Sequence, residues 1–108
     1  MAIIELGGKE RTLRYDYNAL ADLEERAGLS IQALLDDQRL GLATIRAIIW
    51  AGLRHRDKGL TPAQVGIWLQ QYMTSGGDLQ ALMDAVQRAL EESGLFKAAA
   101  GTDDEGNG

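Results

Sequence analysis

The residues of this chain best suited to chemistry lie in one stretch, 45-IRAIIWAGLRHRD-57. It contains the only histidine, His55, one of the two tryptophans, Trp50, and three arginines. Such a stretch could be a catalytic loop, a nucleic-acid contact, or the buried helix of a small binding protein. Each alternative needs different residues elsewhere in the chain, so the remaining sequence can separate them.

The groups that catalysis would need beside this stretch are missing. His55-Arg56-Asp57 has the order of a kinase catalytic loop, but Gly7-Gly8 lacks the rest of a phosphate loop, and a kinase needs about twice this length. The chain has no cysteine and no second histidine, which excludes disulfides and thiolate catalysis and argues against a zinc site. Adjacent carboxylates such as Glu24-Glu25 point about 100° apart on a helix and do not converge. We therefore predict no catalytic residue, no metal, no cofactor and no enzyme activity.

Charge argues against the nucleic-acid alternative. The net charge is −5, from 11 basic and 16 acidic residues, which does not attract a polyanion. A helix-turn-helix would place 61-TPAQVGIWLQQYM-73 in the major groove, yet this segment has no lysine or arginine for phosphate contacts. No apolar run approaches the roughly 20 residues that span a bilayer, and no signal peptide is recognisable. We expect a cytoplasmic protein with neither nucleic acid nor membrane as partner.

A β-hairpin is predicted at the N-terminus. Residues 2–6 and 10–15 form two short extended runs around Gly7-Gly8-Lys9. In the second run Leu13 and Tyr15 alternate with polar residues. A two-stranded ribbon is marginal in water, so one face of this hairpin should pack on helices.

Capping signals divide the following residues into short helices. The predicted N-caps are Asp16, Ser30, Thr61 and Asp78, and the predicted helix-ending glycines are Gly28 and Gly94. A third helix is predicted from residue 43 or 44 to His55. The fold class is therefore mostly α (α+β), an N-terminal β-hairpin followed by a bundle of four to five short helices. Residues 1–97 make one domain, and 98–108 are expected to be a disordered acidic tail.

The opening stretch is predicted to be the central helix, because residues 47–53 contain no polar side chain. Arg46, Trp50 and Arg54 lie on one line of this helix. Two interpretations stay open. In the first, the arginine stems cover the indole at a partly exposed edge. In the second, Trp50 anchors a protein partner.

Further aromatic and methionine side chains follow at helical spacing in the fourth predicted helix. Trp68, Tyr72 and Met73 fit a core, and they also fit an adaptable apolar groove for a partner helix. The candidate partner-binding residues are therefore Arg46, Trp50, Arg54, Trp68, Tyr72 and Met73.

The order of these motifs resembles a known family. The segments 15-YDYNALADLEERAGLSIQALL-35, 47-AIIWAGLRHRD-57 and 60-LTPAQVGIWL-69, followed by a final amphipathic helix, are similar to small tail assembly chaperones of long-tailed phages. Gene transfer agents share this group, whose members are also labelled as gene-transfer-agent tail tube proteins. The resemblance covers roughly residues 3–90.

The resemblance implies a non-enzymatic role in the host cytoplasm. Such chaperones bind the tape measure protein before the tail tube polymerises around it, and they are generally absent from the finished particle. Tail tube subunits are a further candidate partner. The acidic tail is too short to be the extension that a ribosomal frameshift adds in many phages. Two alternatives stay open: a minor structural component of the tail, and a small regulatory binding protein.

Overall fold

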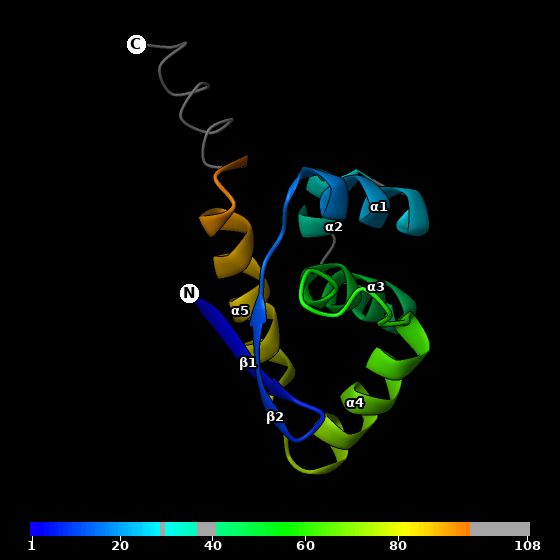
Figure 1. Cartoon of the computed structure of the whole chain (residues 1–108), viewed down its shortest axis with the longest axis vertical. Coiled ribbons are helices and arrows are strands. Elements are labelled where there is room, and N and C mark those ends of the chain that lie inside the picture. The colour runs from blue at the N-terminus through cyan, green and yellow to red at the C-terminus, as the bar shows by residue number, and fades with distance from the viewer. Residues whose placement is uncertain (29, 37–40, 96–108) are drawn as a thin grey trace.

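The computed structural model describes residues 1–28, 30–36 and 41–95. In these residues a two-stranded antiparallel hairpin precedes five helices (Figure 1), which is the predicted fold class. The prediction of a disordered tail over 98–108 lies outside the described residues.

The hairpin consists of β1 (Ala2–Leu6) and β2 (Lys9–Leu13). Gly7 and Gly8 both have positive φ, 61° and 83°, which closes the turn in two residues and pairs Leu6 with Lys9. The predicted three-residue turn, with a second strand over 10–15, was therefore wrong at both ends. Lys9 belongs to β2, and the strand ends at Leu13.

Five helices follow the hairpin, and four of them begin at the predicted N-caps. They are α1 (Tyr17–Ala27), α2 (Ile31–Asp36), α3 (Leu42–Leu53), α4 (Pro62–Thr74) and α5 (Leu79–Glu92). Side chains of Asp16, Ser30, Thr61 and Asp78 each accept a backbone N–H of the first turn, at 2.8 to 3.2 Å. Gly28 has φ 71°, the left-handed conformation predicted for a helix end.

The third helix is shifted toward the N-terminus relative to its prediction. Gly41 caps it, since the Ile45 amide bonds to the Gly41 carbonyl at 3.0 Å. At its other end the amides of Arg56 and Asp57 bond three residues back, to Leu53 and Arg54. These tighter turns end α3 at Leu53, before His55.

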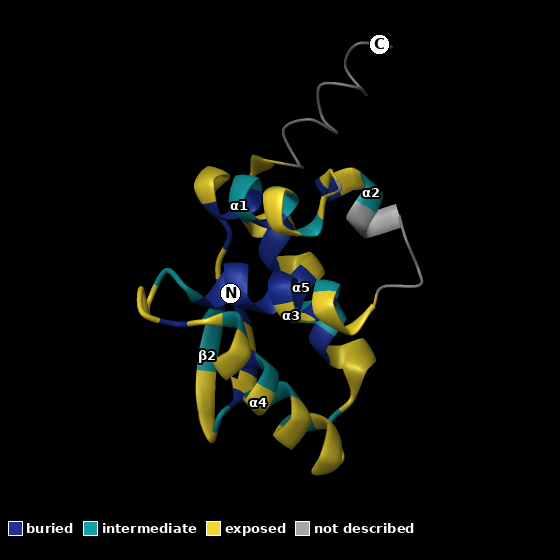
Figure 2. Cartoon of the chain, turned by 90° about the vertical axis from the view of Figure 1, so that its right-hand side faces the viewer, coloured by how far each residue is buried: buried dark blue, intermediate teal, exposed yellow. Residues whose placement is uncertain are grey.

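α3 is the central helix, as predicted. It contacts α1, α4, α5 and β2, and all eight residues that it buries lie between Ile45 and Leu53 (Figure 2). Gly52 lets the hairpin close on it, because a Cβ there would lie 2.8 Å from the Tyr15 ring. The Tyr15 hydroxyl donates to the Ile48 carbonyl at 2.6 Å, and the Arg14 amide donates to the Gly52 carbonyl at 2.9 Å.

Candidate protein-binding surface

Trp50 is a core residue and not an accessible anchor in this conformation. Its side chain is 8% exposed, and its indole N–H donates to the Leu60 carbonyl at 2.9 Å. The Arg54 guanidinium lies over the ring, at 5.1 Å from the centroid, and Arg26 of α1 lies closer, at 4.5 Å. The expected edge formed by Arg46 and Arg54 is therefore wrong in part. α1 packs against α3 there and supplies the second arginine, which closes the edge.

Trp68 supports the hairpin. Its half-buried indole lies beneath Arg11, whose guanidinium carbon is 3.8 Å from the ring centroid. Arg11 also donates from Nε to the Leu6 carbonyl at 2.7 Å. Gly7 leaves no space beside this indole, since a Cβ there would lie 2.8 Å from it. The side chain therefore joins α4 to the hairpin turn.

Tyr72 fastens the connection between α4 and α5. Its hydroxyl donates to the Asp78 carbonyl at 2.7 Å and accepts from the Asp78 amide at 3.1 Å. The Gly77 amide returns to the Tyr72 carbonyl at 2.8 Å. This ring shapes the turn before α5, and its polar group is already satisfied within the chain.

Only two of the six predicted residues, Arg46 and Met73, lie in one open apolar groove. The groove has a volume of about 430 Å³ and runs between α3 and α4 to the start of α5. Its lining residues are Leu42, Ala43, Ile45, Arg46, Gly66, Leu69, Gln70, Met73 and Leu79. The exposed fraction is 46% for Met73 and 87% for Leu42.

Sequence reasoning missed the two leucines at the ends of the groove. Leu42 fell before the predicted start of its helix, although Gly41 ahead of it is an acceptable N-cap. Leu79 directly follows the predicted N-cap Asp78, and it is 37% exposed at the first position of α5. Both residues sit at helix starts, where an apolar periodicity cannot distinguish the inner from the outer face.

The composition of α4 makes this groove unusual for a surface. Its 13 residues, PAQVGIWLQQYMT, include no charged side chain, and only Val65 is buried. Ile67 is 54% exposed and does not belong to the groove lining. Helices that face water normally carry charges there, so α4 is unusually apolar for a helix on the surface.

A family model described as "Phage tail tube protein, GTA-gp10" matches residues 2–94. The chain belongs to this family. Searches of curated proteins and of solved structures found no match. The matched range contains every strand and helix from β1 to α5, so the groove lies within the family's domain. The predicted resemblance is thereby confirmed as far as a phage or gene-transfer-agent tail family.

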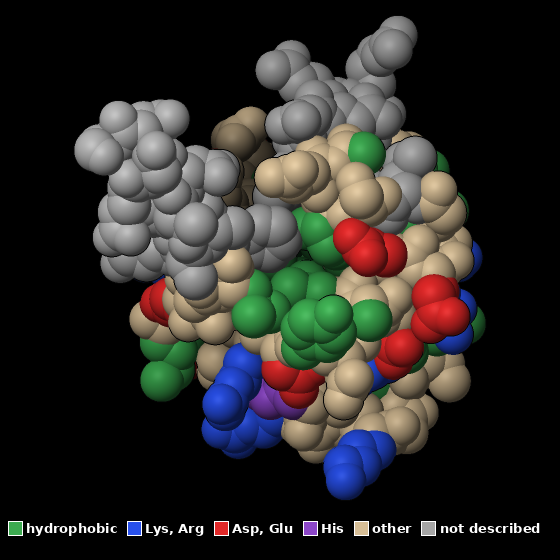
Figure 3. All heavy atoms as spheres, turned by 90° about the horizontal axis from the view of Figure 1, so that it is seen from above, with side chains coloured by type: hydrophobic (Ala, Val, Ile, Leu, Met, Phe, Trp, Pro, Cys, Tyr) green, Lys and Arg blue, Asp and Glu red, His purple; other side chains and the backbone are tan. Residues whose placement is uncertain are grey.

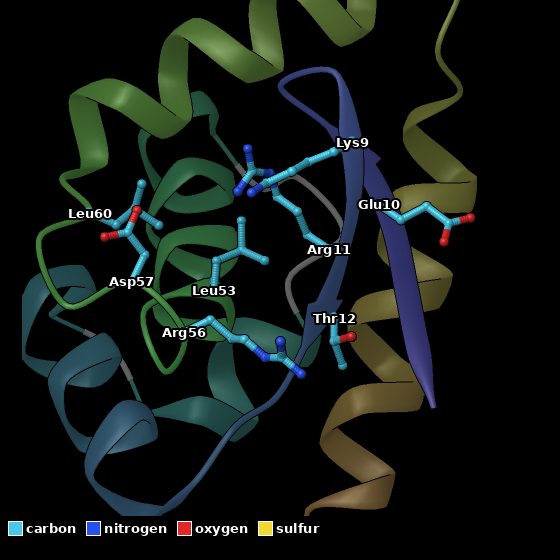
Figure 4. A pocket seen from close by; sticks show the side chains of 8 residues that line it. All are labelled: Lys9, Glu10, Arg11, Thr12, Leu53, Arg56, Asp57 and Leu60. Atoms are coloured by element: carbon cyan, nitrogen blue, oxygen red, sulfur yellow. The ribbon is translucent and has the colours of Figure 1, made fainter.

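A smaller hollow of this tail-tube-family protein lies between β2 and the turn after α3 (Figure 4). Its volume is about 160 Å³, and its lining includes Lys9, Arg11, Arg56 and Asp57. Two of these side chains already make contacts within the chain. Arg11 stacks on Trp68, and Asp57 accepts the Gly59 amide at 3.2 Å. The residues around this hollow therefore hold the hairpin against the turn that follows α3.

His55 belongs to the same junction. It follows the end of α3, and its Nε2 lies 2.9 Å from the Thr12 carbonyl oxygen of β2. In the described residues, no group of three or more histidine, aspartate or glutamate side chains could hold a metal ion. The histidine thus connects helix to hairpin, a role for which the sequence held no signal because the contact spans 43 positions.

On the face that Figure 3 shows, hydrophobic side chains lie beside acidic and basic ones. A third hollow lies between the end of β2 and the end of α5. It measures about 600 Å³ and is lined by Arg14, Asp16, Glu92 and Leu95 among others. The N-terminal amine lies 2.6 Å from the Glu92 carboxylate, and this hydrogen bond lowers the pKa of Glu92. The lining is mixed in polarity, unlike the groove beside α4.

None of the described helices is both long enough and apolar enough to cross a membrane.

Proposed function

We propose that this member of the tail tube family is a non-enzymatic tail assembly chaperone. It binds helical segments of the tape measure protein in the host cytoplasm and departs as the tail tube forms. The observation that supports this proposal most directly is α4, which has no charge in 13 residues and buries only Val65. An apolar helix left on the surface is stabilised when a partner covers it.

The chemistry of the groove suits this partner. A tape measure protein is a long helical chain with apolar surface that must stay soluble until the tube encloses it. The groove offers leucines and a methionine, whose flexible thioether adapts to different side chains. A helix laid into such a groove is a common mode of recognition. The contact is small, so the bound segment can be released when tube subunits replace the chaperone.

The second candidate is a structural component of the tail, and the family description favours it. A tube wall needs each subunit to make repeated contacts with its neighbours on two sides. In residues 1–28, 30–36 and 41–95 the only sheet is the hairpin, which also packs on α3, α4 and α5. The two roles differ in how many copies of this chain the finished particle contains. Mass spectrometry of purified particles tests this candidate, because a wall subunit must be among the abundant proteins.

Co-expression with the tape measure protein tests the chaperone role. We expect the soluble fraction of the tape measure protein to rise several-fold in the presence of the wild-type chain. Met73→Asp places a charge in the groove and should remove the gain. Gln71→Asp adds the same charge at an exposed position of α4 outside the groove lining, and should retain it. An equally soluble tape measure protein with and without the chain would refute the chaperone role.

A further inference from the structure

The groove between α3 and α4 has one charged side chain in its lining, and that charge is positive. Arg46 is exposed on α3, and its stem passes close to Gly66 of α4, where a Cβ would lie 3.3 Å from the arginine Cδ. The ion pairs found within the described part of the chain do not include Arg46. Its guanidinium therefore stands at the edge of an apolar surface, and no ion pair among the described residues uses it.

We infer that this groove binds an amphipathic helix that carries a carboxylate beside its apolar stripe. The inference deepens the proposed function, on which it rests, by stating the chemistry of the segment that is bound. Leucine-type side chains at positions i, i+3, i+4 and i+7 of that helix face Leu42, Leu69 and Met73. A glutamate or aspartate on the flank nearest α3 meets Arg46.

The shape of the lining selects a helix over an extended segment. Every lining residue belongs to α3, α4 or the start of α5, so the groove contains no strand edge. An extended peptide would bring backbone N–H and C=O groups into an apolar site that offers only Arg46 and Gln70 as polar side chains. A helix satisfies its own backbone hydrogen bonds and presents apolar side chains alone.

The sign of the flanking charge follows from the arginine. Covering Arg46 with an apolar or basic surface would remove water from a cation without replacing it. A carboxylate restores a charge-assisted hydrogen bond, and it disfavours partners with lysine at that position. This local preference opposes the net charge of −5, which by itself repels acidic peptides.

Two synthetic helical peptides test the inference on the full chain. Both carry the same leucine stripe, and they differ in having glutamate or lysine along its flanks. In fluorescence anisotropy at low salt we expect the glutamate peptide to bind about five-fold more tightly, the size of a rim charge pair. Arg46→Glu should invert this preference. Lys58→Glu makes the same change in net charge at an exposed position outside the groove and should preserve it.

Met73→Asp should weaken both peptides at least ten-fold, and circular dichroism confirms that each variant is folded. Absence of binding by either peptide, or equal effects of Arg46→Glu and Lys58→Glu, would overturn the inference. Concentration-dependent dimerisation of the wild-type chain that Met73→Asp abolishes would also overturn it, because the occupant would then be a second copy.

The outcome is separable from that of the proposed function. Solubilisation of the tape measure protein that persists in Arg46→Glu would refute the charged-helix inference and leave the chaperone role standing. A clear peptide preference without any effect on the tape measure protein would refute the chaperone role and leave the groove's specificity standing.

Discussion

α3 and α4 are nearly equal in length and have at most one charged side chain each, yet the chain uses them in opposite ways. α3 has 12 residues and buries eight of them, while α4 has 13 and buries one. α3 lies among α1, α4, α5 and β2, whereas α4 packs mainly on α3 and β1 (Figures 1 and 2). A scarcity of charged residues alone therefore does not distinguish a core helix from a surface helix. The two helices are distinguished by how many other helices and strands pack around each of them.

One pair of isoleucines should show this difference most strongly. Ile49 of α3 is 0% exposed and Ile67 of α4 is 54% exposed. Ile49→Ala leaves a cavity in the core and should cost about 3 kcal/mol of unfolding free energy. Ile67→Ala removes a surface side chain and should change it by less than about 0.5 kcal/mol. Urea denaturation of the two variants measures both values, and similar losses would contradict the assignment of α4 as a surface helix.

Two helix glycines should respond with opposite signs. Gly52→Ala places a methyl group 2.7 Å from the Leu13 side chain and 2.8 Å from the Tyr15 ring, and should cost about 2 kcal/mol. Gly66→Ala meets only the stem of exposed Arg46, at 3.3 Å, which can shift. There alanine should be neutral or stabilise the chain by about 0.5 kcal/mol, because it restricts the unfolded state. Thermal melts compare the two, and a destabilised Gly66→Ala would mean that α3 and α4 are already in tight contact along the groove.

The fold could be predicted where the signal is local. Thr61 and Pro62 begin α4, and Gly7-Gly8 turns the hairpin, because each acts through backbone geometry within a few residues. Hydrophobic density likewise identified α3 as central. The missed boundaries, at Leu42 and Lys9, depended on one hydrogen bond or one turn conformation. Residue types alone do not specify such details.

The candidate site was predicted less well, because it depends on which elements meet. Trp50 and Trp68 look alike in sequence, but α1 covers one and the hairpin turn covers the other. Met73 and Arg46 are brought together only by the packing of α4 on α3. A single sequence contains no record of these distant contacts, so the groove became visible only in the structure.

Tyr15 ties the hairpin to α3, and burial raises the pKa of its hydroxyl above the ordinary value of 10.0. The folded state therefore retains a proton that the unfolded chain releases above that pH. The contribution of the protonated Tyr15 hydroxyl to the free energy of unfolding is fully present below pH 10 and declines as the pH rises beyond that value. Tyr15→Phe should lose about 1 kcal/mol at neutral pH with the hydrogen bond to Ile48. Urea titrations at pH 7 and above pH 10 should show a smaller pH-dependent loss in the variant. If the wild-type chain and Tyr15→Phe lost the same stability between these two pH values, the pH dependence would not come from Tyr15.

A small loss of stability is expected for the two charged variants of α4, so that a loss of binding can be separated from a loss of folding. Met73→Asp and Gln71→Asp both add a negative charge near the C-terminal end of α4, where the helix dipole disfavours it. Each should therefore cost a similar amount, about 0.5 kcal/mol, in chemical denaturation. Of these two residues, Met73 lines the groove and Gln71 does not. Therefore only Met73→Asp should lose partner binding. If Met73→Asp proved far less stable than Gln71→Asp, the methionine would belong to the core, and α4 would no longer differ from α3 in the way that the docking proposal requires.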